Sequence, residues 1–289
     1  MKLSFSRLPT YPWWGQGTPV YANNLAMKLG QIPNQSLVEK EHRNVLKHLR
    51  QYTQVEVFPF PSQLDANGVN KHDAVFTRDA FISDQKGSII ISNFSEKERQ
   101  VEAEARAPLL KELGYKTLRL PDDAYAEGGE FYYIPKDGIL FAGVCRNNKK
   151  GVEEVARLLQ VKELCIIESD SFHLDTLFTM LLDKKGHLCG VIVCFELIKN
   201  KKELLTFAKK HHIEVLAVKP IDTIGFDGNG MISVNCVAIP GILFGGNKFI
   251  TPGVNEKIQQ MGIQHVVSPV TQFLLSGGGI HCLANELLM

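Results

Sequence analysis

The sequence has 289 residues, 44% of them hydrophobic and 22% charged, which is the composition of an ordinary globular protein. A formal net charge of +1 gives no reason to expect a nucleic-acid or membrane partner, and no apolar run approaches the roughly 18–20 residues that span a bilayer. The N-terminus lacks the apolar core of a signal peptide, so we expect a cytoplasmic protein.

Helix patterns recur about every fifty residues, with starts near residues 36, 95, 148, 200 and 252. Ser36 and Glu39 form a capping-box pattern at the first start. The second pattern opens at Ser95 and contains Pro108, which we expect to kink or split the helix because proline removes a backbone hydrogen bond. Asn200 is expected to cap the fourth helix.

An apolar strand follows each helix, and before most helices two strand patterns are joined by a glycine turn. The strands after the helices read VEVFPF, KTLRL, ELCII, IEVLAV and HVVSPV. The first unit lacks one leading strand and the chain ends in a single strand, so the C-terminal strand is expected to complete the first unit. This closure predicts an α/β ring of five ββαβ units in one domain over residues 1–289. An open solenoid is the alternative that the repeat leaves.

Polar and nucleophilic residues interrupt the leading strand of each unit. In a ring these strands face the centre, so their unusual side chains are expected to converge: Asp73, Asp79, Glu127, His173, Asp175, Asn235 and Cys282. Because side chains alternate along a strand, His173 and Asp175 are expected on one side, and His281 is expected to face away from Cys282. Each residue alone has an ordinary structural explanation, but their equivalent places in different units favour a site. Asn235 stays unassigned.

The combination of a cysteine, a histidine and several carboxylates indicates thiol chemistry. A cysteine is mostly protonated near neutral pH, and a nearby histidine can move protons for it. Glu127 is the candidate to orient the imidazole of His173, as in triad-like sites. Extra carboxylates normally raise the pKa of a thiol, so Asp79 and Asp175 suit a nucleophilic Cys282 only if the substrate is cationic. A guanidinium has the planar, multi-donor form that carboxylates bind well.

Four short motifs occur in order along the chain: FTRD at 76–79, EGG at 127–129, FHLDTLFTM at 172–180 and GGGIHC at 277–282. Together they resemble the guanidine-modifying superfamily of arginine deiminases, dimethylarginine dimethylaminohydrolases, agmatine deiminases and amidinotransferases. The resemblance covers residues 73–282 and implies a pseudo-fivefold α/β propeller, the pentein fold, closed by the C-terminal strand.

The resemblance also implies a set of catalytic roles. Cys282 would be the nucleophile, His173 the general acid/base and Glu127 the partner of His173, while Asp79 and Asp175 would hold the guanidinium nitrogens. The implied reaction passes through a covalent S-alkylthiouronium, which water converts to a ureido product, and it needs no metal or other cofactor.

The same resemblance implies binding residues for an amino-acid substrate. Arg146, in FAGVCRNN, matches the arginine that pairs with the α-carboxylate, and Asp73 occupies the place that contacts the α-amino group. Arg99 is a second candidate carboxylate partner, although its spacing from FTRD departs slightly from the family pattern. The expected partner is therefore a small guanidino compound, and exposed ring edges would also allow a homodimer.

The subfamily stays open at this point. Asp175 in HLDT favours deiminases and amidinotransferases, Arg146 favours an amino acid over agmatine, and the chain length is near that of dimethylarginine hydrolases. An arginine dihydrolase would fit the same motifs. A non-catalytic pentein binding protein would lack the Cys–His–carboxylate set, and a papain-like hydrolase would carry its cysteine near the N-terminus. Residues 13–17 are expected to form a buried plug or, alternatively, a flap over the site.

Overall fold

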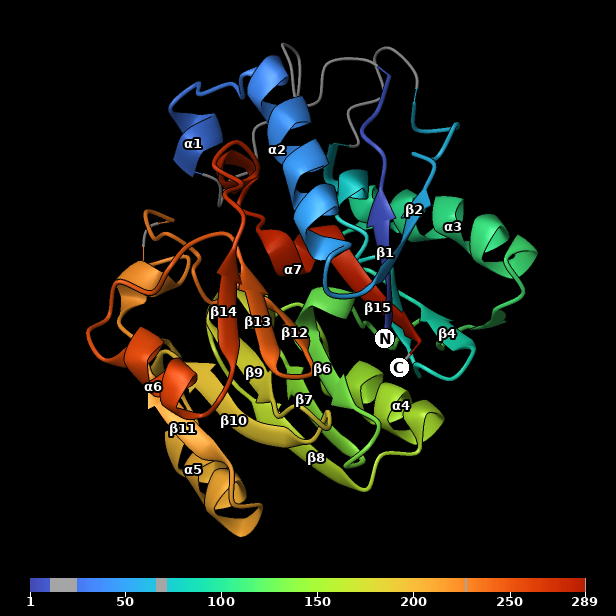
Figure 1. Ribbon diagram of the computed structural model, residues 1–289. Helices are drawn as coiled ribbons and strands as arrows, with labels where there is room; N and C mark the ends of the chain where they lie inside the picture. Colours follow the sequence, from blue (N-terminus) through green and yellow to red (C-terminus); the bar gives the residue numbers. More distant parts are fainter. Residues whose placement is uncertain (11–24, 66–71, 227, 289) are drawn as a thin grey trace.

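The computed structural model describes residues 1–10, 25–65, 72–226 and 228–288, so the segment at 13–17 lies outside the described residues. Within these ranges the strands form five three-stranded sheets (Figure 1). The strands are β1 Lys2–Ser6, β2 Gln54–Phe58, β3 Phe81–Ser83, β4 Ser88–Ile91, β5 Lys116–Leu118, β6 Phe131–Ile134, β7 Ile139–Gly143, β8 Glu163–Ile167, β9 Phe178–Leu182, β10 Leu188–Val193, β11 Glu214–Ala217, β12 Val237–Ile239, β13 Ile242–Gly245, β14 Gln264–Val267 and β15 Ala284–Leu288. The helices are α1 Leu25–Lys28, α2 Gln35–Leu49, α3 Lys97–Glu112, α4 Lys149–Leu159, α5 Lys201–Lys210, α6 Val254–Gln260 and α7 Ile280–Leu283.

Each sheet has the same strand arrangement. In the sheet of β3, β4 and β5, the middle strand β4 is antiparallel to β3 and parallel to β5. A parallel pair needs a crossover connection, and the helix of each unit provides it. In the sheet that holds both termini, β15 takes the leading place: it is antiparallel to β1, which is parallel to β2. The predicted pentein-type ββαβ repeat and its closure by the C-terminal strand are thus confirmed.

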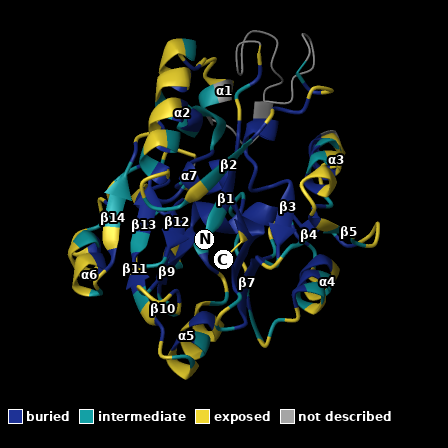
Figure 2. Cartoon of the chain, turned by 45° about the vertical axis from the view of Figure 1, so that its right-hand side comes forward, coloured by how far each residue is buried: buried dark blue, intermediate teal, exposed yellow. Residues whose placement is uncertain are grey.

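The helices bury one face against the sheets and expose the other (Figure 2). In α4, Val152, Val155 and Leu159 are buried in one cluster with Leu140 of β7. Apolar residues spaced three or four apart form such a stripe along a helix. Every residue of β9 is also buried. His173 and Asp175, which precede this strand, are likewise buried. No helix in the described ranges is long and apolar enough to cross a membrane.

Two predictions about helix ends and breaks were wrong. Helix α2 begins after Asn34, whose side chain accepts a hydrogen bond from the backbone nitrogen of Leu37, so Ser36 lies inside the helix and does not cap it. Helix α3 continues unbroken past Pro108. Its apolar face is buried in the core on both sides of the proline, which offsets the one backbone hydrogen bond that proline removes.

Short turns before the leading strands carry the polar residues of the centre. The 3₁₀ turns His72–Val75, Gly128–Glu130 and Leu174–Thr176 precede β3, β6 and β9, and the short helix α7 precedes β15. The prediction that these residues lie in strands is therefore wrong. Side chains fan out in several directions from a turn, so strand alternation does not decide which face each one takes. Instead, equivalent turns of different units meet and bring their side chains to one point.

Candidate active site

Asn235 positions the thiol of Cys282. Its Nδ2 lies 3.2 Å from Cys282 Sγ, and its Oδ1 accepts hydrogen bonds from the backbone nitrogens of His281 (2.8 Å) and Cys282 (3.2 Å). A Cβ atom at Gly279 would lie 2.7 Å from Asn235 Oδ1, so the glycine gives the amide room to reach the start of α7. The structure thus gives a place to Asn235, which the sequence left unassigned.

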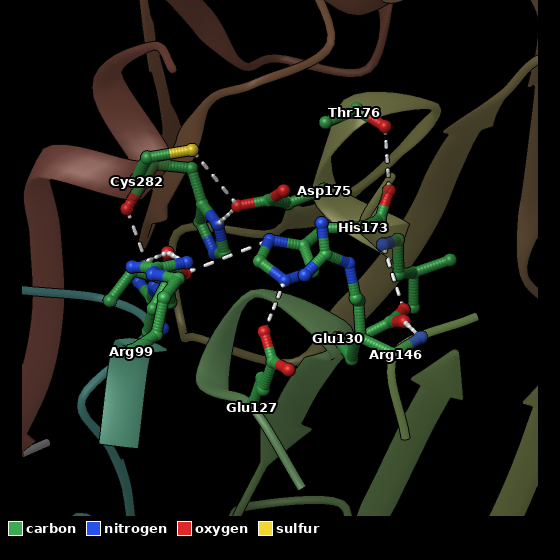
Figure 3. Close-up of polar contacts among 12 residues, drawn as sticks. Arg99, Glu127, Glu130, Arg146, His173, Asp175, Thr176 and Cys282 are labelled. Atoms are coloured by element: carbon green, nitrogen blue, oxygen red, sulfur yellow. Dashed lines mark hydrogen bonds and ion pairs between the residues drawn. The ribbon is translucent and has the colours of Figure 1, made fainter. Parts of the chain in front are cut away.

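His173 lies between two buried carboxylates. Its Nε2 is 2.9 Å from Glu127 Oε2, and its Nδ1 is 3.8 Å from Asp79 Oδ1 (Figure 3). A Cβ atom at Gly129 would lie 2.7 Å from Nδ1 of the imidazole and 2.9 Å from Asp79 Oδ1, which explains why the EGG motif needs glycine at this place. The predicted pairing of Glu127 with His173 is what the geometry shows.

Asp175 joins the nucleophile to a second histidine. Its Oδ2 accepts a hydrogen bond from Nδ1 of His281 at 2.8 Å and lies 3.4 Å from Cys282 Sγ. The prediction that His281 faces away from the site is therefore wrong, because residues 280–283 form a helical turn and not a strand. The ring of His281 is stacked on Tyr132, with centroids 4.5 Å apart.

Two carboxylate oxygens in this centre have no hydrogen-bond partner among the described residues: Oδ1 of Asp79 and Oδ1 of Asp175. Both side chains are almost fully buried. Leaving a buried polar atom unsatisfied costs about 1–3 kcal/mol, so such atoms in a folded protein usually await a ligand or water. The site therefore has the form of a receptor for a buried group with several N–H donors.

The charges of the site are strongly coupled. Burial alone would lower the pKa of His173, but Asp79, Glu127 and Asp175 outweigh it and raise that pKa to about 9. Burial would likewise raise the pKa of Glu127, yet the hydrogen bond and charge of His173 bring it down to about 2. Burial, Asp175 and Asp79 hold the pKa of the Cys282 thiol well above its usual range. Near neutral pH the protein groups of the site are thus an imidazolium, a thiol and several carboxylates.

The predicted substrate-binding arginines have different surroundings. Arg99 is buried, and both of its Nη atoms lie 3.1 Å from Asp79 Oδ2, while its Nε donates to Glu102. Arg146 stacks on the ring of Phe172, 4.3 Å from its centroid, and that ring adjoins His173.

A pocket of about 770 Å³ opens beside this stack and is lined in part by Arg146, Cys145, Asp170, Ser171, Phe172 and Lys199. Asp73 lies buried in its turn, and its charge helps to raise the pKa of Arg99. Arg146 and Phe172 thus line the pocket, whereas Asp79, Asp175 and Cys282 do not.

Sequence reasoning missed a clamp that holds the nucleophile segment. The backbone nitrogen of Arg78 donates to Cys282 O at 3.1 Å, and its Nε donates to His281 O at 3.3 Å. Both Nη atoms of Arg78 bind the carboxylate of Glu286, and Nη1 also donates to Asn285 Oδ1. A charged residue, Glu286, among the apolar residues of the C-terminal stretch CLANELL was the available sequence signal.

Glu130 was missed as well. Its Oε1 accepts from the backbone nitrogen of Arg146 at 2.6 Å, and its Oε2 accepts from the backbone nitrogen of Leu174 at 2.9 Å. A Cβ atom at Gly143 would overlap this carboxylate, 1.8 Å from Oε2. Glu130 therefore ties the loop that carries Arg146 to the turn that carries Asp175.

Comparison with known proteins identifies the family of the chain. Residues 21–289 match the family model described as N,N dimethylarginine dimethylhydrolase, eukaryotic. The bifunctional arginine dihydrolase/ornithine cyclodeaminases ArgZ of Synechocystis sp. and AgrE of Nostoc sp. are each 27% identical over 215 residues, which is 73% of this chain. The chain spans only 28% and 29% of those two relatives.

Solved structures show the same fold. The N-terminal domain of ArgZ bound to its substrate superposes with a TM-score of 0.77 at 20% identity and covers 99% of this chain and 98% of that domain. DDAH from Pseudomonas aeruginosa, complexed with citrulline, gives a TM-score of 0.72 at 12% identity and covers 99% of this chain and 98% of its own. The family match and the fold place the chain in the pentein guanidine-modifying class of enzymes. More narrowly, the chain belongs to the eukaryotic N,N-dimethylarginine dimethylhydrolase family.

Proposed function

We propose that residues 1–289 act as one catalytic domain that hydrolyses the guanidinium group of arginine or an N-methylated arginine through a covalent intermediate on Cys282. The observation that carries this proposal is the pair of unsatisfied buried oxygens, Asp79 Oδ1 and Asp175 Oδ1, beside the thiol. A guanidinium is planar, carries a fixed positive charge and offers several N–H donors, so it can donate hydrogen bonds to both carboxylates at once.

The positive charge of the substrate also explains how the protonated thiol of Cys282 becomes a nucleophile. In the empty site Asp175 and Asp79 disfavour a thiolate at Cys282, so the thiol is protonated and unreactive. A guanidinium cation bound between these carboxylates neutralises them and adds positive charge beside the sulfur, which lowers the pKa of the thiol. The nucleophile is therefore activated when the cation binds, because the thiol of Cys282 then loses its proton to solvent.

The reaction then proceeds in two steps. The Cys282 thiolate attacks the guanidinium carbon, a C–S bond forms, and the C–N bond to the departing amine breaks as the imidazolium of His173 donates its proton to that amine. The neutral His173 next accepts a proton from water, and the resulting hydroxide adds to the same carbon. The C–S bond then breaks as the proton of the new hydroxyl group passes to the sulfur, which gives the neutral ureido product and restores the thiol of Cys282. Glu127 keeps the imidazole oriented and stabilises its charged form through both steps.

We assign the remaining residues by their surroundings. Arg146, which lines the pocket beside Phe172, is the residue for the substrate α-carboxylate. The family resemblance assigns Asp73 to its α-amino group. Arg99 is engaged by Asp79 and Glu102, so we assign it to holding Asp79 in place and make it a secondary contributor to carboxylate binding. A substrate with both groups of a free amino acid uses the whole site.

The choice of substrate rests on two different comparisons. The family model favours a dimethylated arginine, whereas the ArgZ and AgrE relatives favour arginine and make an arginine dihydrolase the second candidate. Purified protein would be incubated separately with arginine, asymmetric dimethylarginine and agmatine, and the products identified by mass spectrometry. Citrulline with dimethylamine supports the first candidate, and ornithine with two ammonia per arginine supports the second. Citrulline with ammonia indicates a simple deiminase, and no product from any of the three contradicts the proposal.

A further inference from the structure

Arg146 faces a carboxylate of the protein itself. Its Nη1 lies 2.6 Å from Oε1 of Glu96, and the two side chains differ in exposure: that of Arg146 is 12% exposed and that of Glu96 is 45% exposed. Arg146 is fixed by its stack on Phe172 and by the hydrogen bond from its backbone nitrogen to Glu130. The glutamate is therefore the member of the pair that can move away into solvent.

Among the described residues, the Glu96 side chain forms no ion pair other than the one with Arg146. It is the N-cap residue of α3, but its side chain makes no capping hydrogen bond to the helix. The contact with Arg146 is close but poorly directed, because Arg146 Nη1 has no hydrogen-bond partner of acceptable geometry among the described residues. A carboxylate that approached the guanidinium in its plane would form two aligned hydrogen bonds and would be the better partner.

We propose that Glu96 competes with the α-carboxylate of the substrate for Arg146. This competition raises the KM of the enzyme for amino-acid substrates. The inference rests on the proposed function, in which Arg146 receives that carboxylate. When such a substrate binds, Glu96 leaves Arg146, and its negative charge then lies near a second carboxylate. The lost ion pair and the repulsion both weaken binding, whereas a guanidine without a carboxylate leaves the Glu96–Arg146 pair in place.

The test is the Glu96→Gln substitution, which keeps the shape of the side chain and removes its charge. We expect the KM for the best arginine substrate to fall about two- to five-fold, the range that a partly exposed ion pair supports, with kcat unchanged. The inhibition constant of agmatine, which has no carboxylate, should stay the same. Glu104→Gln is the matched control, because Glu104 lies on the same helix and forms an exposed ion pair with Arg119; it should change neither constant.

A double variant separates competition from a general electrostatic effect. In an Arg146→Ala background there is no guanidinium to compete for, so Glu96→Gln should cause little further change in KM. An unchanged KM in Glu96→Gln, or an equal fall in the agmatine inhibition constant, would overturn the inference. These outcomes differ from a failure of the proposed function, in which the wild-type enzyme itself turns over none of the guanidines.

Discussion

The Nε2 atom of His173 lies 2.9 Å from Oε2 of Glu127, and both side chains are almost completely buried. This pair, together with Asp79, keeps the imidazole charged over the physiological range, because its pKa is raised to about 9. A charged imidazole is a proton donor, so the resting enzyme is prepared to protonate a departing amine. The charged imidazole contributes stability that is fully present below the ordinary histidine pKa of about 6.5 and is lost as the pH rises through about 9. Glu127, whose pKa is lowered to about 2, contributes stability that is present above its ordinary pKa of 4.5 and is lost as the pH falls toward 2.

Glu127→Gln should remove the hydrogen-bonded charge and let the pKa of His173 fall. We expect kcat to drop by about 10²-fold or more, because the general acid loses its orientation and its proton, and the alkaline limb of the pH profile to move to lower pH. The free energy of unfolding at pH 7 should fall by about 2 kcal/mol. The pH dependence of kcat measures the first effect, and denaturant titration measures the free energy of unfolding. Glu153→Gln, an exposed partner of Lys149, is the control and should change neither; an unmoved alkaline limb in Glu127→Gln would contradict the role of the pair.

Asp175→Asn should affect the thiol and the turnover in opposite directions. Removal of a negative charge lowers the pKa of Cys282, so the thiol should react faster with iodoacetamide at pH 7.5. Turnover should nevertheless fall by at least about 10²-fold, because a partner of the guanidinium is lost. Peptide mass spectrometry after timed alkylation identifies Cys282 among the other cysteines. Asp123→Asn, an exposed partner of Lys150, should leave both rates as they are. Slower alkylation of Cys282 in Asp175→Asn would be inconsistent with this account of the thiol.

Arg78→Met should loosen the segment that carries the nucleophile. It leaves the buried carboxylate of Glu286 without its ion pair, which costs about 3–5 kcal/mol of stability. Changing Glu286 to Gln in the same chain should recover part of that loss, because no buried charge is left unpaired. Arg119→Met, which breaks an exposed pair with Glu104, should cost about 1 kcal/mol or less. Urea denaturation distinguishes these values; equal losses for Arg78→Met and Arg119→Met would show that no clamp exists.

Arg146→Ala should reduce the preference for amino-acid substrates. We expect the KM for the best arginine substrate to rise by about ten-fold or more, since a hydrogen-bonded ion pair to a charged group contributes about 1.5–3 kcal/mol. The inhibition constant of agmatine should change little. Arg157→Ala removes an exposed arginine that pairs with Glu154 and serves as the control. If Arg146→Ala leaves the discrimination between arginine and agmatine as it was, the carboxylate lies elsewhere.

The sequence predicted the repeat well because helix and strand periods are local properties. The five helices expected from the repeat, α2 to α6, begin close to the predicted starts, and the incomplete first and last units correctly required β15 to join β1. The N-cap of α2 was predicted at Ser36, but Asn34 takes that position. Nearby polar residues compete for one capping position, and the backbone conformation decides between them.

The site was harder to predict, because its residues sit in turns whose directions the alternation of a strand does not describe. His281 was therefore assigned to the wrong face, although it hydrogen-bonds to Asp175. Asn235 and Arg78 act through backbone groups far away in the sequence, at Cys282 and His281, and no local pattern reports such contacts. The contact between Glu96 and Arg146 joins two units of the repeat and is likewise visible only in three dimensions.

The most direct test of the central claim is the turnover number of Cys282→Ser with the best guanidine substrate. The account predicts a loss of at least about 10³-fold in kcat, because the hydroxyl of serine is a far weaker nucleophile than a thiolate, while the variant still folds and still binds the substrate. Retention of substrate binding would be checked by calorimetry on the same preparation. Near-normal turnover by Cys282→Ser would contradict covalent catalysis at this residue.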